Sequence, residues 1–346
     1  MNGNHQTKKK VCTVIFILIN IAVIAATAYN EFADKPTGSI ELRFTKQAMF
    51  FLGCTGLCLV VLLLAESLKY WLMMRSLREK ASFRVAFETA ALGKYYDCIT
   101  PSGAGGQPFQ ILWLHRHGYA DGASSAMTIA GYITMQAGFI LLAIAVFITS
   151  RSVDLEAIRY TAYSGLLLFS LIPCLLFFFS FMPGTVKRLV SAIIRLCGKL
   201  KLIKHPDEST ERIMVMLDKY HKSFKTISRD KFTLACMLIL SLIYRIALCS
   251  MPYFVLKMFG APVSFLHVFS STIYIYASIA LVPTPGNAGA AEGAFYLVFS
   301  AMRSEGVFWG MLIWRFFCHY SFIIIGAIIY GLNAINKKRS QGGTDT

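Results

Sequence analysis

Ionisable side chains lie inside apolar stretches of this chain that are long enough to cross a membrane. Arg245 is near the middle of the stretch 232–257, and Arg315 and His319 are four residues apart in the stretch 307–332, so they share one helical face. A charge at such depth is costly and belongs either to a ligand site or to a structural ion pair. Both interpretations stay open for each residue, and both require a partner.

Candidate partners flank two places where the apolar sequence is broken. Glu292 follows the second break and is the expected partner of Arg315. Lys94 and Asp97 precede the first break and are three residues apart, a spacing that brings side chains of a helix together. We therefore expect two ion pairs, one beside each break.

The two breaks are rich in proline and small residues, and both contain the pattern P-x-x-A-G. The first break and the helix after it supply the candidate ligand-binding residues Thr100, Pro101, Gly105, Gly106, Gln107 and Gln110. The second supplies Pro285, Gly286, Asn287, Gly289 and Glu292. A broken helix is tolerated within a membrane only where protein or a wet cavity satisfies the freed backbone groups. The alternative is that each break is an ordinary loop between two spans.

The composition predicts a polytopic all-α membrane protein, because 56% of the 346 residues are hydrophobic. The helices of such a protein would position the residues named above. Six segments are long enough to span: about 11–29, 47–72, 123–149, 160–182, 232–257 and 307–332. The broken stretches 83–117 and 264–302 are each expected to form two half-helices that return to the same side. Glu66 and Lys69 lie near the end of a span, and we expect them to reach the membrane surface.

The distribution of charge supports the re-entrant arrangement. With the N-terminus inside and both broken stretches re-entrant, the outside segments 30–46, 150–159 and 302–306 each have zero net charge, whereas the inside segments are all positive. The segment 184–231 carries twelve Lys and Arg against five Asp and Glu. The apolar residues of its first part share one helical face, which is typical of a helix on an anionic leaflet, although a solvated basic loop fits as well.

An internal repeat relates the two broken stretches. A shift of 184 residues places Pro101 on Pro285 and Asp121 on Glu305, and superposes the flanking spans, which gives repeat A at about 47–149 and repeat B at about 231–333. A single full span separates the repeats, so they have inverted topology, and in such folds the substrate site lies near the midplane. Half-helix N-termini favour an anionic ligand, for which phosphate is the obvious candidate in a lipid setting.

Known catalytic and metal-binding patterns do not occur in the sequence. G-x-S-x-G, Walker A, H-E-x-x-H, Rossmann and CxxC patterns are missing, so we expect no catalytic residue, no metal site and no cofactor. The net charge of +16 is assigned to topology, and no nucleic-acid partner is expected.

The paired motifs ITPSGAGGQPFQ (residues 99–110) and PTPGNAGAAEGAF (residues 283–295) resemble the membrane region of the lysylphosphatidylglycerol synthase/flippase family, which includes the multiple peptide resistance factor. The resemblance implies a flippase for aminoacylated phosphatidylglycerol. In full-length members a separate cytosolic domain transfers lysine from lysyl-tRNA, and we expect that domain to be absent here. Asn287 stands where the family commonly has glycine.

Two functions follow as hypotheses. The first is a flippase-like translocator of phosphatidylglycerol or its aminoacylated form, with an anionic phospholipid as partner. The second is a membrane component of phosphatidylglycerol lysyltransfer whose transferase is a cytosolic partner chain. A carrier of a non-lipid anion or of a lipid-linked sugar is a further alternative, and so is assembly as a homo-oligomer. We expect a bacterial inner membrane location with both termini cytoplasmic.

Overall fold

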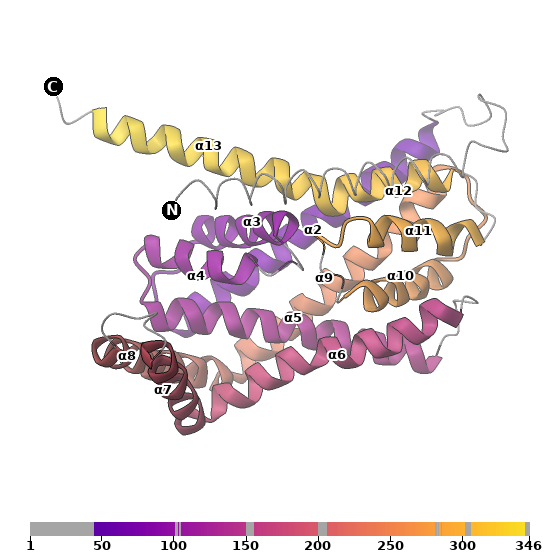
Figure 1. The fold of residues 1–346 in the computed structure, drawn as a ribbon. Coiled ribbons are helices and arrows are strands. Elements are labelled where there is room, and N and C mark those ends of the chain that lie inside the picture. The colour runs from indigo at the N-terminus through magenta and orange to yellow at the C-terminus, as the bar shows by residue number, and fades with distance from the viewer. Residues whose placement is uncertain are drawn as a thin grey trace.

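The computed structural model describes residues 45–100, 103, 105–149, 156–199, 206–280, 282, 284, 286–301 and 306–342. Within these ranges the chain is helical and contains no strand, which confirms the all-α prediction (Figure 1). Five helical segments are long and apolar enough to cross a membrane. They are α2 (Lys46–Ser76), α5 (Asp121–Thr149), α6 (Glu156–Phe181), α9 (Lys231–Met258) and the segment that α12 begins at Val307. These match five of the six predicted spans, and the sixth, 11–29, lies outside the described residues.

The first broken stretch forms a helical hairpin. It consists of α3 (Phe83–Ile99), which Ser82 caps by accepting the backbone N–H of Val85, and α4 (Gly106–Arg116). The outer ends of the hairpin lie together, because the Tyr119 hydroxyl after α4 donates to the Lys80 carbonyl before α3 at 2.6 Å. The chain therefore returns to the side from which it came, as the charge distribution predicts.

The second broken stretch forms a hairpin of α10 (Phe265–Ile279) and α11 (Ala290–Ala301). Here too the outer ends are neighbours, since a Cβ added at Gly306, just after α11, would meet the ring of Phe259, just before α10. Both helices are shorter than a membrane-spanning helix, so each can reach only part of the way through a bilayer.

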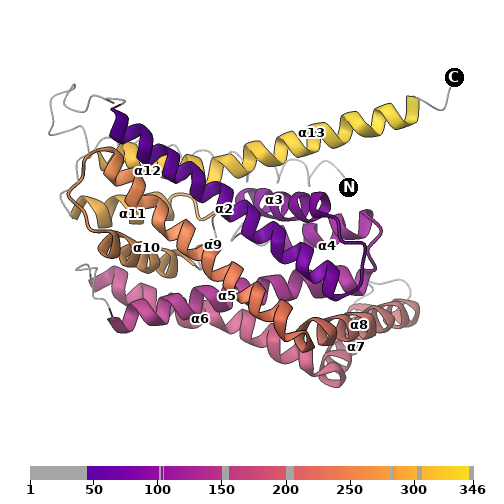
Figure 2. The same ribbon diagram turned by 180° about the vertical axis from the view of Figure 1, so that it is seen from behind.

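The helices α2 and α9 pack side by side and run in opposite directions (Figure 2). Phe51 near the start of α2 stacks on Phe254 near the end of α9, and Met73 near the end of α2 shares a buried cluster with Met237 near the start of α9. The α3/α4 hairpin follows α2 and the α10/α11 hairpin follows α9. The two hairpins consequently enter the bundle from opposite ends.

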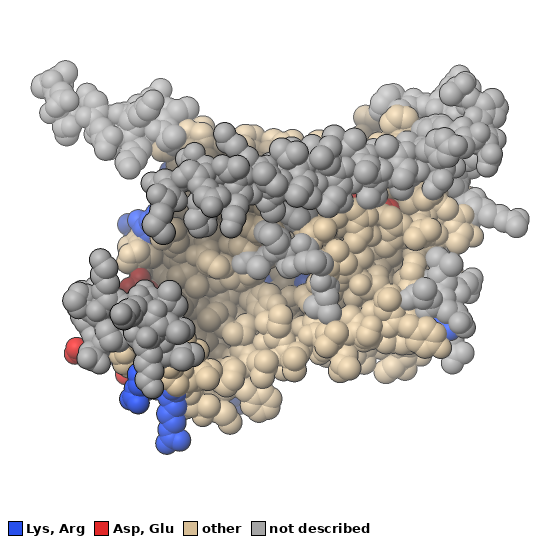
Figure 3. All heavy atoms as spheres, in the orientation of Figure 1, with Lys and Arg blue, Asp and Glu red and all other residues tan. Residues whose placement is uncertain are grey.

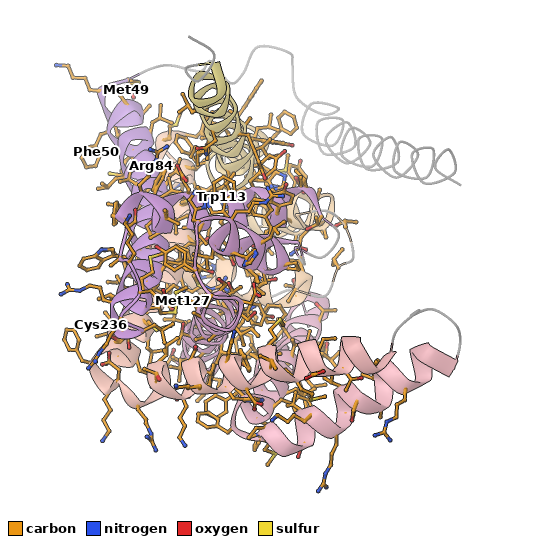
Figure 4. All side chains as sticks on the ribbon, turned by 90° about the vertical axis from the view of Figure 1, so that its left-hand side faces the viewer. Met49, Phe50, Arg84, Trp113, Met127 and Cys236 are labelled. Carbon is orange, nitrogen blue, oxygen red and sulfur yellow. The ribbon has the colours of Figure 1, made fainter. Side chains whose placement is uncertain are left out.

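The basic segment is helical rather than a loop in the residues described. It forms α7 (Pro183–Lys199) and α8 (Pro206–Arg229), which pack on one another at one end of the bundle. Figure 3 shows Lys and Arg gathered at this end, and Figure 4 shows long side chains projecting outward from these helices. Helix α8 lies close to α5 at Gly122, where a Cβ would meet the backbone of Lys219 at 2.6 Å.

Candidate functional site

The tips of the two hairpins meet inside the bundle. Gly286, in the second break, has φ +56° and lies against Cys98, the penultimate residue of α3: a Cβ at Gly286 would be 3.1 Å from the Cys98 carbonyl oxygen and would clash with the His319 ring. Cys98 in turn directs its thiol toward the carbonyl oxygen of His319 at 3.7 Å. Two breaks that are far apart in sequence thus form one junction with the last span.

A buried ion pair stabilises the second break, the segment between α10 and α11. Nε of Arg315 is 2.5 Å from Oε1 of Glu292, and both side chains are almost fully buried. The other carboxylate oxygen of Glu292 accepts the backbone N–H of Gly289 at 2.8 Å, and the guanidinium donates to the Gly286 carbonyl at 3.4 Å. The expected pairing of these two residues is present. It satisfies backbone groups that the break releases, as the low dielectric of the interior requires.

The last span is not a regular helix beside this junction. Helix α12 (Val307–Arg315) passes through a π-helix, η1 (Phe316–Tyr320), into α13 (Ser321–Gly342). The π-turn contains His319, which is buried, and follows Arg315 directly. Short π-helical turns inside α-helices occur frequently at functional sites.

Asn287 adopts a left-handed backbone conformation, with φ +54°. Glycine takes this conformation without strain, and asparagine tolerates it better than most other residues do. This explains physically how Asn287 stands at a position where glycine fits. Pro101 and Pro285, the candidate prolines of the two breaks, lie outside the described residues.

The first break is fastened by side chains at the end of α3. Oδ1 of Asp97 accepts the N–H of Gly106, the first residue of α4, at 3.1 Å, and the Thr100 hydroxyl accepts the N–H of Gly105 at 2.9 Å. Nζ of Lys94 lies 3.4 Å from Oδ2 of Asp97, so the second expected ion pair is also present. The start of α4 is therefore already supplied with acceptors from the chain itself.

The two glutamines of α4 differ in their surroundings. Nε2 of Gln110 donates to the Thr89 carbonyl at 3.4 Å, and its side chain fills the space beside Gly93, which leaves no room for a Cβ there. Gln110 is buried and holds α4 against α3, so the structure does not place it with the second break. Gln107 is half-buried near the start of α4.

Arg245 lies in a third polar region, between α9 and α5. Its Nη2 donates to Oε1 of Gln136 at 2.9 Å, and its guanidinium lies 4.9 Å from the centre of the Phe139 ring. On the same helix Tyr244 is buried, and Nζ of Lys94 lies 5.4 Å from its ring centre. The sequence identified Arg245 but not Gln136, which is 109 residues away and carries no charge to signal its depth.

The expectation that Glu66 and Lys69 reach the membrane surface is wrong. Lys69 is completely buried, with Nζ 2.9 Å from Oε2 of Glu66 and 3.3 Å from the Gly131 carbonyl oxygen. Helix α2 continues to Ser76, so both residues lie further inside the helix than the predicted end at residue 72 indicated. They form a third ion pair, which is buried like that of Glu292 and Arg315.

The arrangement can bind a polar or charged group within an otherwise apolar bundle. It has two discontinuous hairpins that meet, three ion pairs and one further arginine. The pairs of Lys69 and Arg315 and the further arginine, Arg245, involve helices that are long or apolar enough for a membrane, and the pair of Lys94 lies on the shorter helix α3. Among the residues that the structure describes, no group of three or more His, Cys, Asp or Glu side chains is placed to hold a metal ion.

Comparisons with known proteins agree with this architecture. A family model described as the lysylphosphatidylglycerol synthase TM region matches residues 14–326, which confirms the resemblance seen in the two motifs. The chain is also 24% identical to a UPF0104 membrane protein of Archaeoglobus fulgidus over 344 residues, covering 94% of this chain and 98% of that protein. The match therefore spans the whole helical bundle.

Proposed function

We propose that this chain, which belongs to the family of the lysylphosphatidylglycerol synthase TM region, moves a phospholipid between the two leaflets of a membrane. The observation that carries the proposal is the junction of the two hairpin tips around the buried Glu292–Arg315 pair. In transporters, discontinuous helices that meet near the midplane form the substrate site. The substrates we favour are phosphatidylglycerol and its aminoacylated form, because their headgroups are those in the family's description.

We further propose that the two hairpin units are inverted repeats, with boundaries near 47–149 and 231–333. The antiparallel packing of α2 and α9 and the entry of the hairpins from opposite ends support this. Two equivalent halves of opposite orientation allow the site to open to either side by similar movements. In this proposal the protein lies in a bacterial cell membrane with the α7/α8 end in the cytoplasm, in line with the positive-inside rule.

A leaflet assay in proteoliposomes tests the proposed function. Fluorescent phosphatidylglycerol and lysyl-phosphatidylglycerol are placed in one leaflet, and their appearance in the other is followed with and without the protein. We expect protein-dependent movement that Glu292→Gln stops, and that the matched change Glu211→Gln, at an exposed position of α8, leaves intact. Movement of neither lipid by the wild-type protein would contradict the proposal, and full movement by Glu292→Gln would remove Glu292 from the site.

A second candidate function is a membrane component of phosphatidylglycerol lysyltransfer that works with a separate cytosolic transferase. The observation in its favour is the exposed basic side of α8, where Lys222, Lys225 and Arg229 recur at helical spacing. A transferase bound there would deliver its product at the membrane surface. Charge reversal of these three residues should then abolish co-purification of the transferase while leaving lipid movement in proteoliposomes unchanged.

A further inference from the structure

The charges in the middle of the bundle do not balance. Among the residues that the structure describes, the charged side chains of this region are Glu66, Lys69, Lys94, Asp97, Arg245, Glu292 and Arg315, which are called the central charges below. Each of the three carboxylates lies within 3.4 Å of one cation, in the pairs Glu66–Lys69, Asp97–Lys94 and Glu292–Arg315. The other buried carboxylate of the described helices, Glu88, is paired with Arg84 near the start of α3. Four cations against three carboxylates leave one positive charge, and it belongs to Arg245.

Arg245 has a neutral neighbour where each of the other central cations has an anion. In the described part of the chain its hydrogen bond is to the Gln136 amide and its other close contact is the Phe139 ring. Its Nε is buried and has no hydrogen-bond partner among the described residues. Arg245 as a whole is half-buried. A guanidinium without a counter-charge and with a buried, unpartnered donor is an incomplete site, because a cation withdrawn from water requires both a counter-charge and acceptors for its N–H groups.

The position of Arg245 places this charge deep in the membrane. It is 14 residues from the start of α9 and 13 from its end, and Gln136 is equally central in α5. Nζ of Lys94, whose side chain is 30% exposed, lies 5.4 Å from the ring centre of Tyr244, the residue before Arg245. Figure 3 shows Lys or Arg atoms near the middle of this face, away from the basic end of the bundle.

We propose that Arg245, together with Lys94 and Gln136, seats the phosphate group of the substrate. The guanidinium is planar and binds phosphate oxygens through two parallel N–H groups, which suits a phosphodiester better than an ammonium does. The Gln136 amide accepts one hydrogen bond from Nη2 of the guanidinium, and Nε has no partner among the described residues. The lipid identity of the ligand rests on the proposed function, whereas its negative charge rests on the charge imbalance and its phosphate chemistry on the shape of the guanidinium.

Gln136→Glu is the most direct test, because it places the missing carboxylate beside Arg245 with almost no change in shape. The full chain, purified in detergent, is titrated by calorimetry with dihexanoyl-phosphatidylglycerol. We expect Gln136→Glu and Arg245→Gln each to weaken binding about tenfold or more, since a charge-assisted contact is lost. Arg245→Lys should bind with intermediate affinity. Lys257→Gln, which removes a cation from the end of the same helix, should bind as the wild type does.

Gln136→Glu also separates a binding role from a structural one. If Arg245 only supports the fold, the new ion pair leaves phosphatidylglycerol binding unchanged, and that result overturns the proposal. Thermal unfolding of Gln136→Glu at or above the wild-type temperature shows that its lost binding does not come from unfolding. If Arg245→Gln does not fold, Gln136→Glu and Arg245→Lys still decide the question.

Inorganic phosphate, titrated in parallel, distinguishes the two sources of the ligand. Binding of dihexanoyl-phosphatidylglycerol but not of inorganic phosphate identifies a lipid headgroup as the occupant. If both ligands bind equally and Gln136→Glu loses the binding of both, the result supports a phosphate-binding site at Arg245 and shows that free phosphate is sufficient to occupy it. If Gln136→Glu loses binding and the wild type moves no lipid, the result contradicts the proposed function but supports a phosphate-binding site at Arg245.

Discussion

Glu292 and Arg315 are each other's counter-charge at a depth where water cannot replace either partner. Removing one partner of a buried ion pair leaves an unpaired charge and costs about 3–5 kcal/mol, whereas replacing both with apolar side chains of similar volume is often neutral. We therefore expect Glu292→Met to destabilise the protein strongly and the double change Glu292→Met with Arg315→Met to restore most of the stability. Thermal unfolding in detergent measures both effects.

The same pair of variants separates stability from transport. If the ion pair takes part in translocation, the double variant is folded but does not move lipid in the leaflet assay. A single variant as stable as the wild type would show that the charge left behind finds another partner, which the present geometry does not offer.

At the scale of residues, the sequence predicted the two ion pairs whose members lie next to a break. The pairs of Glu292 with Arg315 and of Lys94 with Asp97 are both present. The sequence could predict them because an isolated charge within a membrane has a high free energy and therefore requires a partner. It failed where depth depended on a helix boundary, as for Lys69. It also could not find Gln136, since a neutral residue in an apolar helix gives no signal of its partner.

The turn between α3 and α4 depends on the close approach of two backbones at Gly106. A Cβ there would lie 2.7 Å from the Gly93 carbonyl oxygen and would also collide with the Asp97 carboxylate, neither of which can move without opening the hairpin. We expect Gly106→Ala to destabilise the protein by about 1–3 kcal/mol. Gly53→Ala is the control, because a Cβ at Gly53 meets nothing within 4 Å in α2 and should leave unfolding unchanged or raise its temperature slightly.

Helix α9 begins at a cap whose strength depends on pH. Asp230 accepts the backbone N–H of Thr233 at 3.0 Å and its hydroxyl at 2.7 Å, and these hydrogen bonds hold the pKa of Asp230 below its usual range. A lowered pKa in the folded state means that the cap stabilises the protein fully above the unfolded pKa of about 4 and is lost as the pH falls through the folded value.

Asp230→Ala should accordingly lower stability by about 1 kcal/mol at pH 7. The difference in unfolding temperature between this variant and the wild type should shrink as the pH is reduced below about 4. A difference that is constant between pH 7 and pH 3 would show that the carboxylate charge is not what stabilises the cap.

At the scale of elements, hydropathy located the long helices and both hairpins, because each depends on composition within a short stretch. The π-turn at Phe316–Tyr320 could not be predicted, since the periodicity of the sequence fits a regular helix from 307 to 332 equally well. A π-turn is selected by the packing of the last span around the hairpin tips, which involves residues that are distant in sequence.

The arrangement of the whole bundle indicates which connections between helices lie on the same side of the membrane. The Lys80 and Ala120 positions flank the first hairpin and are exposed at the α7/α8 end, whereas Ser264 is exposed at the opposite end, before α10. In a background without the nine native cysteines, single cysteines at 80 and 120 should react with an impermeant thiol reagent from one side, and a cysteine at 264 from the other. Labelling of 80 and 120 from opposite sides would show that α3 and α4 cross the membrane once.

The imbalance of four central cations against three carboxylates has a consequence for the response to voltage. A bundle with a monoanionic phosphodiester seated at Arg245 carries no net central charge, whereas the empty bundle carries one positive charge. A membrane potential acts on a moving charge with about 2.3 kcal/mol per 100 mV. Exchange of phosphatidylglycerol for phosphatidylglycerol, in which the site is occupied at every step, should therefore be insensitive to an imposed potassium diffusion potential. Net movement in one direction, which includes the return of the empty site, should change its rate with the sign of that potential.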